Sequence, residues 1–411
     1  MTCLVSLFWN GCVPRAQRVT RARPPAQQIP FTTFLQVLPG GRKRPASLAQ
    51  ATSRSASHLT VSSQLDRRTF CKTSSEPSKR DLTERDMSHE VGKTTTREDS
   101  VKAIRTHGRG GPEQLFFEDA PMPEVRSGDV LVRVRATGIT PAELTWDESY
   151  QNADGTARIP GIPGHEVAGV VERMAPDVTD FRPGDEVYGL ADFPRDGAAA
   201  EFAAVRAANL ALKPHSISHE QAAALPLSAL TAWQALFEHA HLAAGQSVLI
   251  HGGAGGVGSL AVQLAHWGGA RVLATASARD MTFVRSLGAD DVIDYHASPF
   301  EETLHEIDMV LDTIGGETRE RSWRVLRKGG VLVTLVSPVP AGVAEQHGVR
   351  GVFFIVRGNR GQLDQISTLV DEGKLKPVIA EVLPLARARE AFEHGAGVHS
   401  PGKIVLRASA A

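Results

Sequence analysis

Cysteine is scarce in this chain. The 411 residues include three cysteines, Cys3, Cys12 and Cys71, so residues 72–411 contain none. A disulfide framework and a thiolate metal site both need cysteine. Neither can therefore occur in the long body of the protein.

Acidic residues are missing from the start of the chain, where none precedes Asp66. Residues 1–86 hold 14 Lys and Arg against 5 Asp and Glu, and they show no helical or strand period. We predict a disordered basic leader over residues 1–98. An organellar transit peptide has a similar composition, which makes a mitochondrial location the alternative to a cytoplasmic one. A start placed upstream of the true one, at Met87, is a third interpretation, and we rank disorder or over-extension above targeting.

Long apolar runs are also lacking. The richest stretch, residues 222–237, is interrupted by Pro226, Ser228, Thr231 and Gln234, so we predict no membrane span. Residues 87–411 hold 31 basic against 41 acidic side chains, and this acidic balance argues against nucleic acid as a partner. The length and the 42% hydrophobic content indicate a soluble protein of two domains.

A glycine-rich loop is the most informative positive feature. Residues 253–258 read Gly-Ala-Gly-Gly-Val-Gly, after an apolar run at 248–250 and before a helical pattern. In such a strand-to-helix turn, Gly253 permits the tight turn, Gly255 lets a pyrophosphate approach, and Gly258 lets the helix lie close to the strand. Gly256 and Val257 complete the cradle. The alternative is a glycine-rich loop with no ligand.

The residues after the next expected strand indicate which dinucleotide binds. An NAD enzyme would carry Asp or Glu there, but this chain has Ala276. Ser277 and Arg279 follow and could hold a 2′-phosphate, which favours NADP. The alternative is that Arg279 is solvated and pairs with the neighbouring Asp280.

The pattern of strand signals changes near residue 218. Before it, Pro- and Gly-rich turns alternate with short strands, such as 130–134 and 186–189; after it, helices alternate with strands expected at 248–250, 272–275, 291–294, 309–312 and 331–336. A last piece, with a helix at 363–370 and a strand at 403–406, is expected to return to the first domain. We predict an α/β fold with a β-rich domain over 99–220, completed by 371–411, and a doubly wound parallel-sheet domain over 221–370.

Five motifs follow one another in the body. They are PGHEVAGVV at 163–171, RPGDEV at 182–187, AALPLSALTA at 223–232, the glycine loop and GKIVL at 402–406. In this order they make residues 101–407 resemble the medium-chain dehydrogenase/reductase superfamily, specifically its zinc-free quinone oxidoreductase branch. The resemblance implies a GroES-like catalytic domain, a Rossmann domain with NADP in the cleft between them, and a homodimer.

The resemblance also implies further cofactor residues. Tyr295 matches a position near the NADP 2′-phosphate, with simple packing as its alternative role. Asp312 and Ser337 match loops beside the nicotinamide. Residues 352–356, an apolar run, match a segment at the cleft and subunit edge, and the alternative is a buried strand.

His165 lies in a Gly-His-Glu sequence that looks like a zinc-ligand motif of alcohol dehydrogenases. The position of that family's first cysteine ligand holds Thr140, and residues 227–229 supply no Cys, Asp or Glu. Catalytic zinc needs about three protein ligands. We therefore predict no metal and expect His165 to be a satisfied structural histidine near the cleft.

Thr140 and Glu143 occupy the positions of a polar pair that is usually Asn and Asp in the family. We expect Thr140 to donate a hydrogen bond to the substrate oxygen, and Glu143 to hold a water or the ribose. Trp146 and Tyr150 are candidates for the cleft wall. The predicted function is reduction of a small quinone or α,β-unsaturated carbonyl by hydride transfer from NADPH. The alternatives are a zinc-type alcohol dehydrogenase and a nucleotide-binding protein without turnover (crystallin-like).

Overall fold

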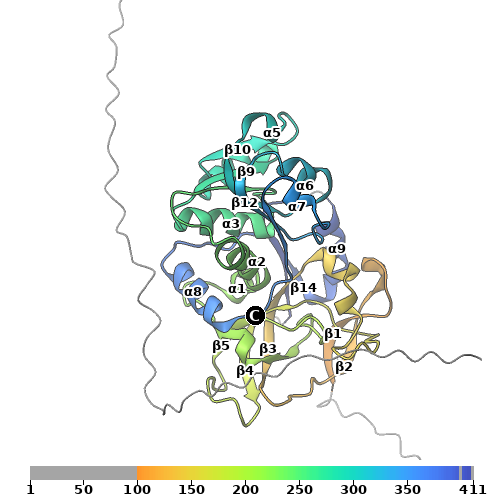
Figure 1. Ribbon diagram of the computed structural model, residues 1–411. Coiled ribbons are helices and arrows are strands. Elements are labelled where there is room, and N and C mark those ends of the chain that lie inside the picture. Colours follow the sequence, from red (N-terminus) through yellow and green to blue (C-terminus); the bar gives the residue numbers. More distant parts are fainter. Residues whose placement is uncertain (1–99, 398–399, 409–411) are drawn as a thin grey trace, which may run out of the picture. The chain divides into compact units, whose positions relative to one another are not determined.

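A computed structural model of the chain describes residues 100–397 and 400–408. The leader predicted over residues 1–98 lies outside the described residues. The described residues belong to one compact unit, which contains every element below (Figure 1).

The first sheet is built around β3, which is buried along most of its length because β4, β6 and β15 all pair with it. The strand order is β14-β15-β3-β4-β5-β7, and the pairs within β15-β3-β4-β5-β7 are antiparallel. A separate antiparallel hairpin, β1 with β2, precedes it. The bounds are β1 (Ser100–Thr106), β2 (Leu115–Pro121), β3 (Asp129–Gly138), β4 (Glu166–Met174), β5 (Glu186–Leu190), β6 (Phe202–Arg206), β7 (Leu210–Leu212), β14 (Ile379–Pro384) and β15 (Lys403–Arg407).

The last strand of the described chain returns to this sheet. β15 pairs antiparallel with β3, with Val405 opposite Gly138, and parallel with β14. The predicted return of the strand at 403–406 is therefore confirmed. The domain boundaries themselves, 99–220 with 371–411 and 221–370, stay a prediction.

The second sheet has six parallel strands in the order β10-β9-β8-β11-β12-β13. Chain order reverses between β8 and β11, as in a doubly wound Rossmann sheet. The predicted fold class is confirmed: a β-rich GroES-like part and a Rossmann-type parallel sheet. The bounds are β8 (Ser247–Ile250), β9 (Arg271–Ala276), β10 (Asp291–Asp294), β11 (Ile307–Asp312), β12 (Leu326–Thr334) and β13 (Arg350–Phe353).

Two strands differ from the sequence-based expectation. β12 begins at Leu326, before the predicted start at residue 331, because the chain passes through Gly329 and Gly330 while the pairing with β11 shifts register. A glycine pair that indicates a turn in the sequence is here an irregularity within a strand. The run at 352–356 gives the edge strand β13, which is half-buried and ends at Phe353.

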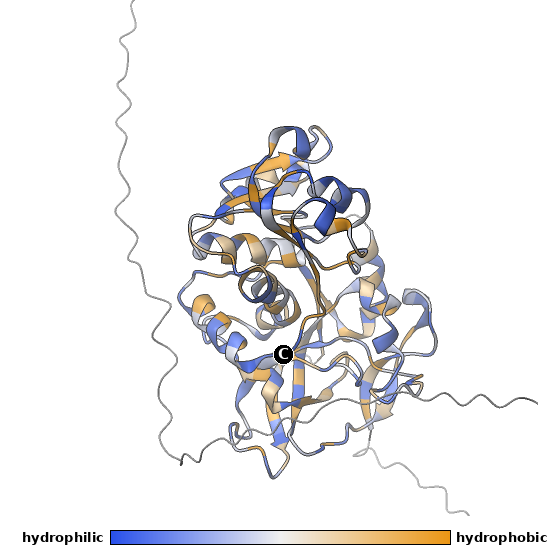
Figure 2. Ribbon diagram, in the orientation of Figure 1, coloured by the Kyte–Doolittle hydropathy of each residue, from blue (hydrophilic) through white to orange (hydrophobic). Residues whose placement is uncertain are grey.

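The α-helices of the described residues connect the strands of the two sheets. They are α1 (His219–Ala223), α2 (Pro226–Trp233), which continues as a π-helix (Gln234–His239), α3 (Gly256–Trp267), α4 (Met281–Ser286), α5 (Phe300–Thr303), α6 (Gly316–Ser322), α7 (Val343–Gln346), α8 (Arg360–Asp371) and α9 (Ala388–Ala396). The predicted helix at 363–370 lies within α8. Figure 2 shows hydrophobic and hydrophilic residues alternating along helices and strands.

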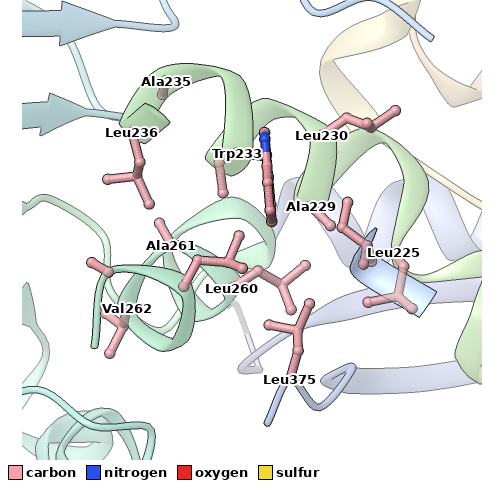
Figure 3. Close-up of a cluster of buried hydrophobic side chains, with 14 of the residues drawn as sticks. Leu225, Ala229, Leu230, Trp233, Ala235, Leu236, Leu260, Ala261, Val262 and Leu375 are labelled. Carbon is pink, nitrogen blue, oxygen red and sulfur yellow. The ribbon is translucent and has the colours of Figure 1, made fainter. Parts of the chain in front are cut away.

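The largest core cluster joins the two sheets through α2 and α3. α2 is buried on every side, and its Ala229 and Trp233 lie toward Leu260 of α3, whereas Leu230 points away from that helix (Figure 3). The same cluster contains Tyr188 of β5, whose hydroxyl donates to the Leu363 carbonyl of α8 at 2.7 Å. Because both helices carry alanine where they meet, α2 and α3 can pack closely. This packing fixes the position of the start of α3 relative to the first sheet.

Candidate functional site

A cavity of about 1350 Å³ lies at the carboxyl ends of β8, β9, β10 and β11 and extends to the first sheet. Crevices at this edge of a doubly wound sheet are the usual ligand sites. Loops and helix ends beside both sheets line it. They are Ile139, Thr140, Leu227 and Ser228 on one side, and Gly252, Gly255–Gly258, Ser277, Arg279, Tyr295, Thr313 and Ile314 on the other, with Glu381, His394 and Lys403 from the last part of the chain.

The roles of the individual glycines in the loop differ in part from those expected. The left-handed residue of the turn is Gly252, with φ 68°, and not Gly253. A Cβ on Gly253 would lie 3.0 Å from side-chain atoms of Ala274 and Val284, so this glycine allows packing against β9. A Cβ on Gly258 would lie 2.1 Å from the Gly252 carbonyl oxygen, which agrees with the predicted close approach of helix and strand.

Gly255 is open toward the cavity. A Cβ there would meet only the Gly252 carbonyl oxygen, at 3.3 Å. Gly255 is also the N-cap of α3, and as a glycine it provides no side chain to cap the first turn. Gly255, Gly256, Val257 and Gly258 all line the cavity. The N–H groups at the start of this 12-residue helix and its dipole therefore fit a bound pyrophosphate.

The two predicted hydrogen-bond donors for the 2′-phosphate, Ser277 and Arg279, both follow β9, but each donates to the Asp280 carboxylate. Ser277 Oγ donates to Asp280 Oδ2 at 2.6 Å, and Arg279 Nε donates to the same oxygen at 3.3 Å. All three residues line the cavity together with Tyr295, which is 54% exposed and lies against His296. A 2′-phosphate in this position would have to replace Asp280 as the acceptor.

Asp312 and Ser337 do not line the cavity. Asp312 is fully buried, where Oδ1 accepts from the N–H groups of Ile314 and Gly315 and Oδ2 accepts from the Thr334 hydroxyl. The carboxylate shapes the loop that carries Thr313 and Ile314, both of which line the cavity, so the expected place of this loop beside the nicotinamide stays a prediction. Ser337 instead bonds to Arg319 of α6.

Lys403, Glu166 and Thr140 form a polar network at the side of the cavity next to the first sheet, and this network was not predicted from the sequence. Lys403 Nζ forms an ion pair with Glu166 Oε2 and donates to Thr140 Oγ1 at 3.0 Å. Glu166 Oε1 accepts from the Leu227 N–H at 3.0 Å. The available signal was the alternation of β15, which puts Lys403 on the same face as the buried Val405. A lysine on the buried face of a strand needs an acidic partner.

Glu143 lies behind the cavity wall. It follows Thr140 in a short 3₁₀ segment, Pro141–Thr145, and is 1% exposed. Its Oε2 accepts from the Gly164 N–H at 3.0 Å and lies 3.7 Å from His165 Nε2. Glu143 is not among the residues that line the cavity, and its Oε1 is buried without a hydrogen-bond partner among the described residues, so its expected role of holding a water or the ribose stays a prediction.

His165 is buried beside Glu143, and its ring differs from the expectation of a satisfied histidine. It is 3% exposed, its ring meets Phe193 edge to face, and neither ring nitrogen has a hydrogen-bond partner among the described residues. Burial lowers the pKa of His165 to about 3 and raises the pKa of Glu143 to about 7, although the Gly164 N–H opposes the second shift. Both groups are therefore neutral in mildly acidic solution.

The two aromatic candidates for the cleft wall also lie outside the cavity lining. Tyr150 is buried and its hydroxyl donates to the Leu144 carbonyl at 2.8 Å. Trp146 packs edge to face on Phe193. Both are packing residues.

The comparisons with known proteins agree with this geometry. The family model described as "Alcohol dehydrogenase GroES-like domain" matches residues 126–215, and the one described as "Zinc-binding dehydrogenase" matches residues 287–406.

Full-length relatives cover both parts. The chloroplastic NADPH-dependent alkenal/one oxidoreductase of Arabidopsis thaliana is 36% identical over 72% of this chain and 77% of its own length. The mitochondrial NAD(P)H oxidoreductase RTN4IP1 of Danio rerio is 34% identical over 71% of this chain and 87% of its own. The chain belongs to the medium-chain dehydrogenase/reductase superfamily. The solved quinone oxidoreductase of Coxiella burnetii is 32% identical, covers 75% of this chain and 99% of that one, and has a TM-score of 0.69. As a member of this superfamily, the protein is an oxidoreductase.

The openness of Gly255 yields a prediction for this dehydrogenase/reductase. A valine there should fill the space that a pyrophosphate needs while disturbing little of the protein. We expect Gly255→Val to lose most dinucleotide affinity in a calorimetric titration with an almost unchanged melting temperature. Gly258→Ala is the matched control, since its Cβ would clash with backbone and should lower the melting temperature. Unchanged affinity in Gly255→Val would contradict the pyrophosphate assignment.

The buried pair yields a pH prediction. Because the folded-state pKa of Glu143 is raised from 4.5 to about 7, the stability that its neutral form provides is full below about pH 4.5 and is lost as the pH rises through 7. Glutamine keeps an acceptor for Gly164 and cannot ionise. Glu143→Gln should therefore gain stability relative to the parent between about pH 5 and about pH 8, measured by urea unfolding. A stability difference that does not change with pH would show that Glu143 is not protonated in the folded protein.

Proposed function

We propose that the protein reduces quinones or α,β-unsaturated carbonyls with NADPH, by hydride transfer without a metal. The observation that carries this proposal is the cavity itself: an uncapped glycine loop stands at one side and a lysine-bonded hydroxyl, Thr140, at the other. The first suits a dinucleotide phosphate and the second an oxygen that gains negative charge.

The residues present fit a nicotinamide dinucleotide. The backbone of Gly255–Gly258 would hold the pyrophosphate, Ser277 and Arg279 the 2′-phosphate, and Tyr295 the adenosine end. When bound, NADPH supplies the hydride. The relatives from Arabidopsis thaliana and Danio rerio, named as NADPH- and NAD(P)H-dependent, support this assignment.

The substrate oxygen would lie at Thr140. The hydroxyl accepts its hydrogen bond from Lys403, which leaves its own hydrogen to be donated into the cavity. A donor aimed at a developing enolate or hydroquinone oxygen lowers the barrier most in a site that excludes water. Ile139, Leu227 and Ile314 supply apolar lining for such a site.

A catalytic zinc ion does not fit the residues of this site. Among residues 100–397 and 400–408, no group of three or more His, Cys, Asp or Glu side chains is placed to hold a metal ion. His165 has one acidic neighbour, Glu143, and both are buried. The family model is described as zinc-binding, but the described side chains around His165 do not supply the three ligands that a catalytic zinc ion needs.

The cofactor preference can be tested at Arg279. We expect NADPH to bind more tightly than NADH, and Arg279→Ala to remove most of that preference, since one charge-assisted contact contributes about tenfold in affinity. Arg285→Ala, on α4 and outside the cavity lining, is the matched control. Equal affinities for NADPH and NADH in the unmutated protein would refute the NADP assignment.

Turnover tests the activity. The purified protein should oxidise NADPH steadily with a naphthoquinone or an enal, and metal analysis should find no stoichiometric zinc. Binding of NADPH without oxidation across quinones, enals and enoyl thioesters would indicate a nucleotide-binding protein without turnover. Alcohol oxidation that depends on stoichiometric zinc would indicate the alcohol dehydrogenase alternative.

Location and assembly stay predictions. No helix in the described part of the chain has the length and apolar character to cross a bilayer. The cytoplasmic location has a mitochondrial alternative, and the relatives with chloroplastic and mitochondrial names support an organelle. Imaging of residues 1–98 fused to a fluorescent protein decides between them.

The protein is also expected to form a homodimer and not to bind nucleic acid. Light scattering tests the first expectation, and a nucleic-acid binding assay tests the second.

A further inference from the structure

Lys403 is placed unlike an ordinary surface lysine. It is 7% exposed, begins β15, and points its ammonium group between Glu166 and Thr140 at the edge of the cavity. Its stem packs against the start of α3, where a Cβ on Gly256 would lie 3.0 Å from Lys403 Cδ. The ammonium group is therefore held by two partners and the stem by a third contact.

The hydrogen bonds of this network run in one direction. Lys403 Nζ donates to Thr140 Oγ1, and the Thr140 hydroxyl keeps its hydrogen for an acceptor in the cavity. Glu166 has one oxygen on the Leu227 N–H and the other on Lys403. The carboxylate thus fixes the ammonium group and offers no second path for its proton toward the cavity.

We propose that Lys403 is the positioning residue that supplies a proton to the substrate through Thr140. This inference rests on the proposed function. With an enal, hydride from NADPH forms a new C–H bond and leaves an enolate oxygen; with a quinone, it forms an O–H bond on one oxygen and leaves the other as a hydroquinone anion. The Thr140 hydroxyl gives its proton to that oxygen and takes one from Lys403, whose ammonium becomes an amine. Water then reprotonates Lys403, so one hydride and one proton are added in each turnover.

A purely electrostatic role for Lys403 would leave a different signature. If its charge alone mattered, through the ion pair with Glu166 or the nearby phosphate cradle, any cation of similar reach would suffice. Arginine keeps the charge but does not give up a proton in proteins. Lys403→Arg therefore separates charge from proton supply.

The experiment compares two acceptors in the unmutated protein and in Lys403→Arg. An enal needs a proton on its weakly acidic enolate, whereas the hydroquinone of a chlorinated benzoquinone is acidic enough to leave as an anion. We expect Lys403→Arg to lose about 100-fold or more in kcat with the enal and less than about tenfold with the quinone. NADPH affinity should change little.

A second pair of variants leaves the ion pair intact. Thr140→Val removes the hydroxyl at nearly constant shape and should show the same acceptor-dependent loss, whereas Thr140→Ser should retain kcat. The double variant Lys403→Arg with Thr140→Val should lose no more than either single variant, because both interrupt one path.

Three results would overturn the proposal: kcat retained in Lys403→Arg, equal losses with both acceptors, or multiplying losses in the double variant. The rates of the unmutated protein separate this failure from a failure of the proposed function, since steady turnover with either acceptor establishes the reductase. Melting temperatures of each variant identify losses that come from misfolding.

Discussion

The ion pair between Glu166 and Lys403 is the interaction on which the arrangement of the cleft depends. Two charges removed from water stabilise a protein only when each is fully paired, and a single partner left alone is costly. Here the carboxylate also holds the start of α2 through Leu227, and the ammonium holds Thr140. One buried contact thus fixes four segments that are distant in sequence.

This constraint explains why the end of the chain returns to the first sheet. β15 carries Lys403 and lies beside β3, whose last residue is followed closely by Thr140. α2 then passes from the ion pair into the alanine-rich contact with α3. The position of the glycine loop is therefore coupled to the position of Thr140, so that the dinucleotide site and the proposed substrate oxygen site are set by the same packing.

The sequence was informative where local pattern and local structure coincide. The glycine loop, the parallel strands at 248–250 and 309–312 and the returning strand at 403–406 are all present, because apolar runs and glycines determine them locally. Side-chain partners were harder to predict. The contact between Arg279 and Asp280 was an alternative that the sequence offered, but the bond from Ser277 to the same carboxylate depends on the short turn after β9.

The buried polar residues were the hardest to assign from sequence. Glu143 was placed at the ligand and Lys403 was not assigned, because both assignments depend on which face of a segment points inward across the two sheets. The resemblance to the superfamily indicated where the motifs lie, but it did not indicate which side chains the buried polar residues contact. Long-range pairing, such as that of residues 166 and 403, leaves no periodic signal in one sequence.

The measurement that tests this account most directly is a double-mutant cycle on the free energy of unfolding, with Lys403→Met, Glu166→Gln and the double variant. Each single change strands a buried partner, so each should destabilise strongly, and the double variant should lose less than the two losses combined, with a coupling of about 1–3 kcal/mol. Additive losses, within about 0.5 kcal/mol, would show that the two side chains do not hold the cleft together.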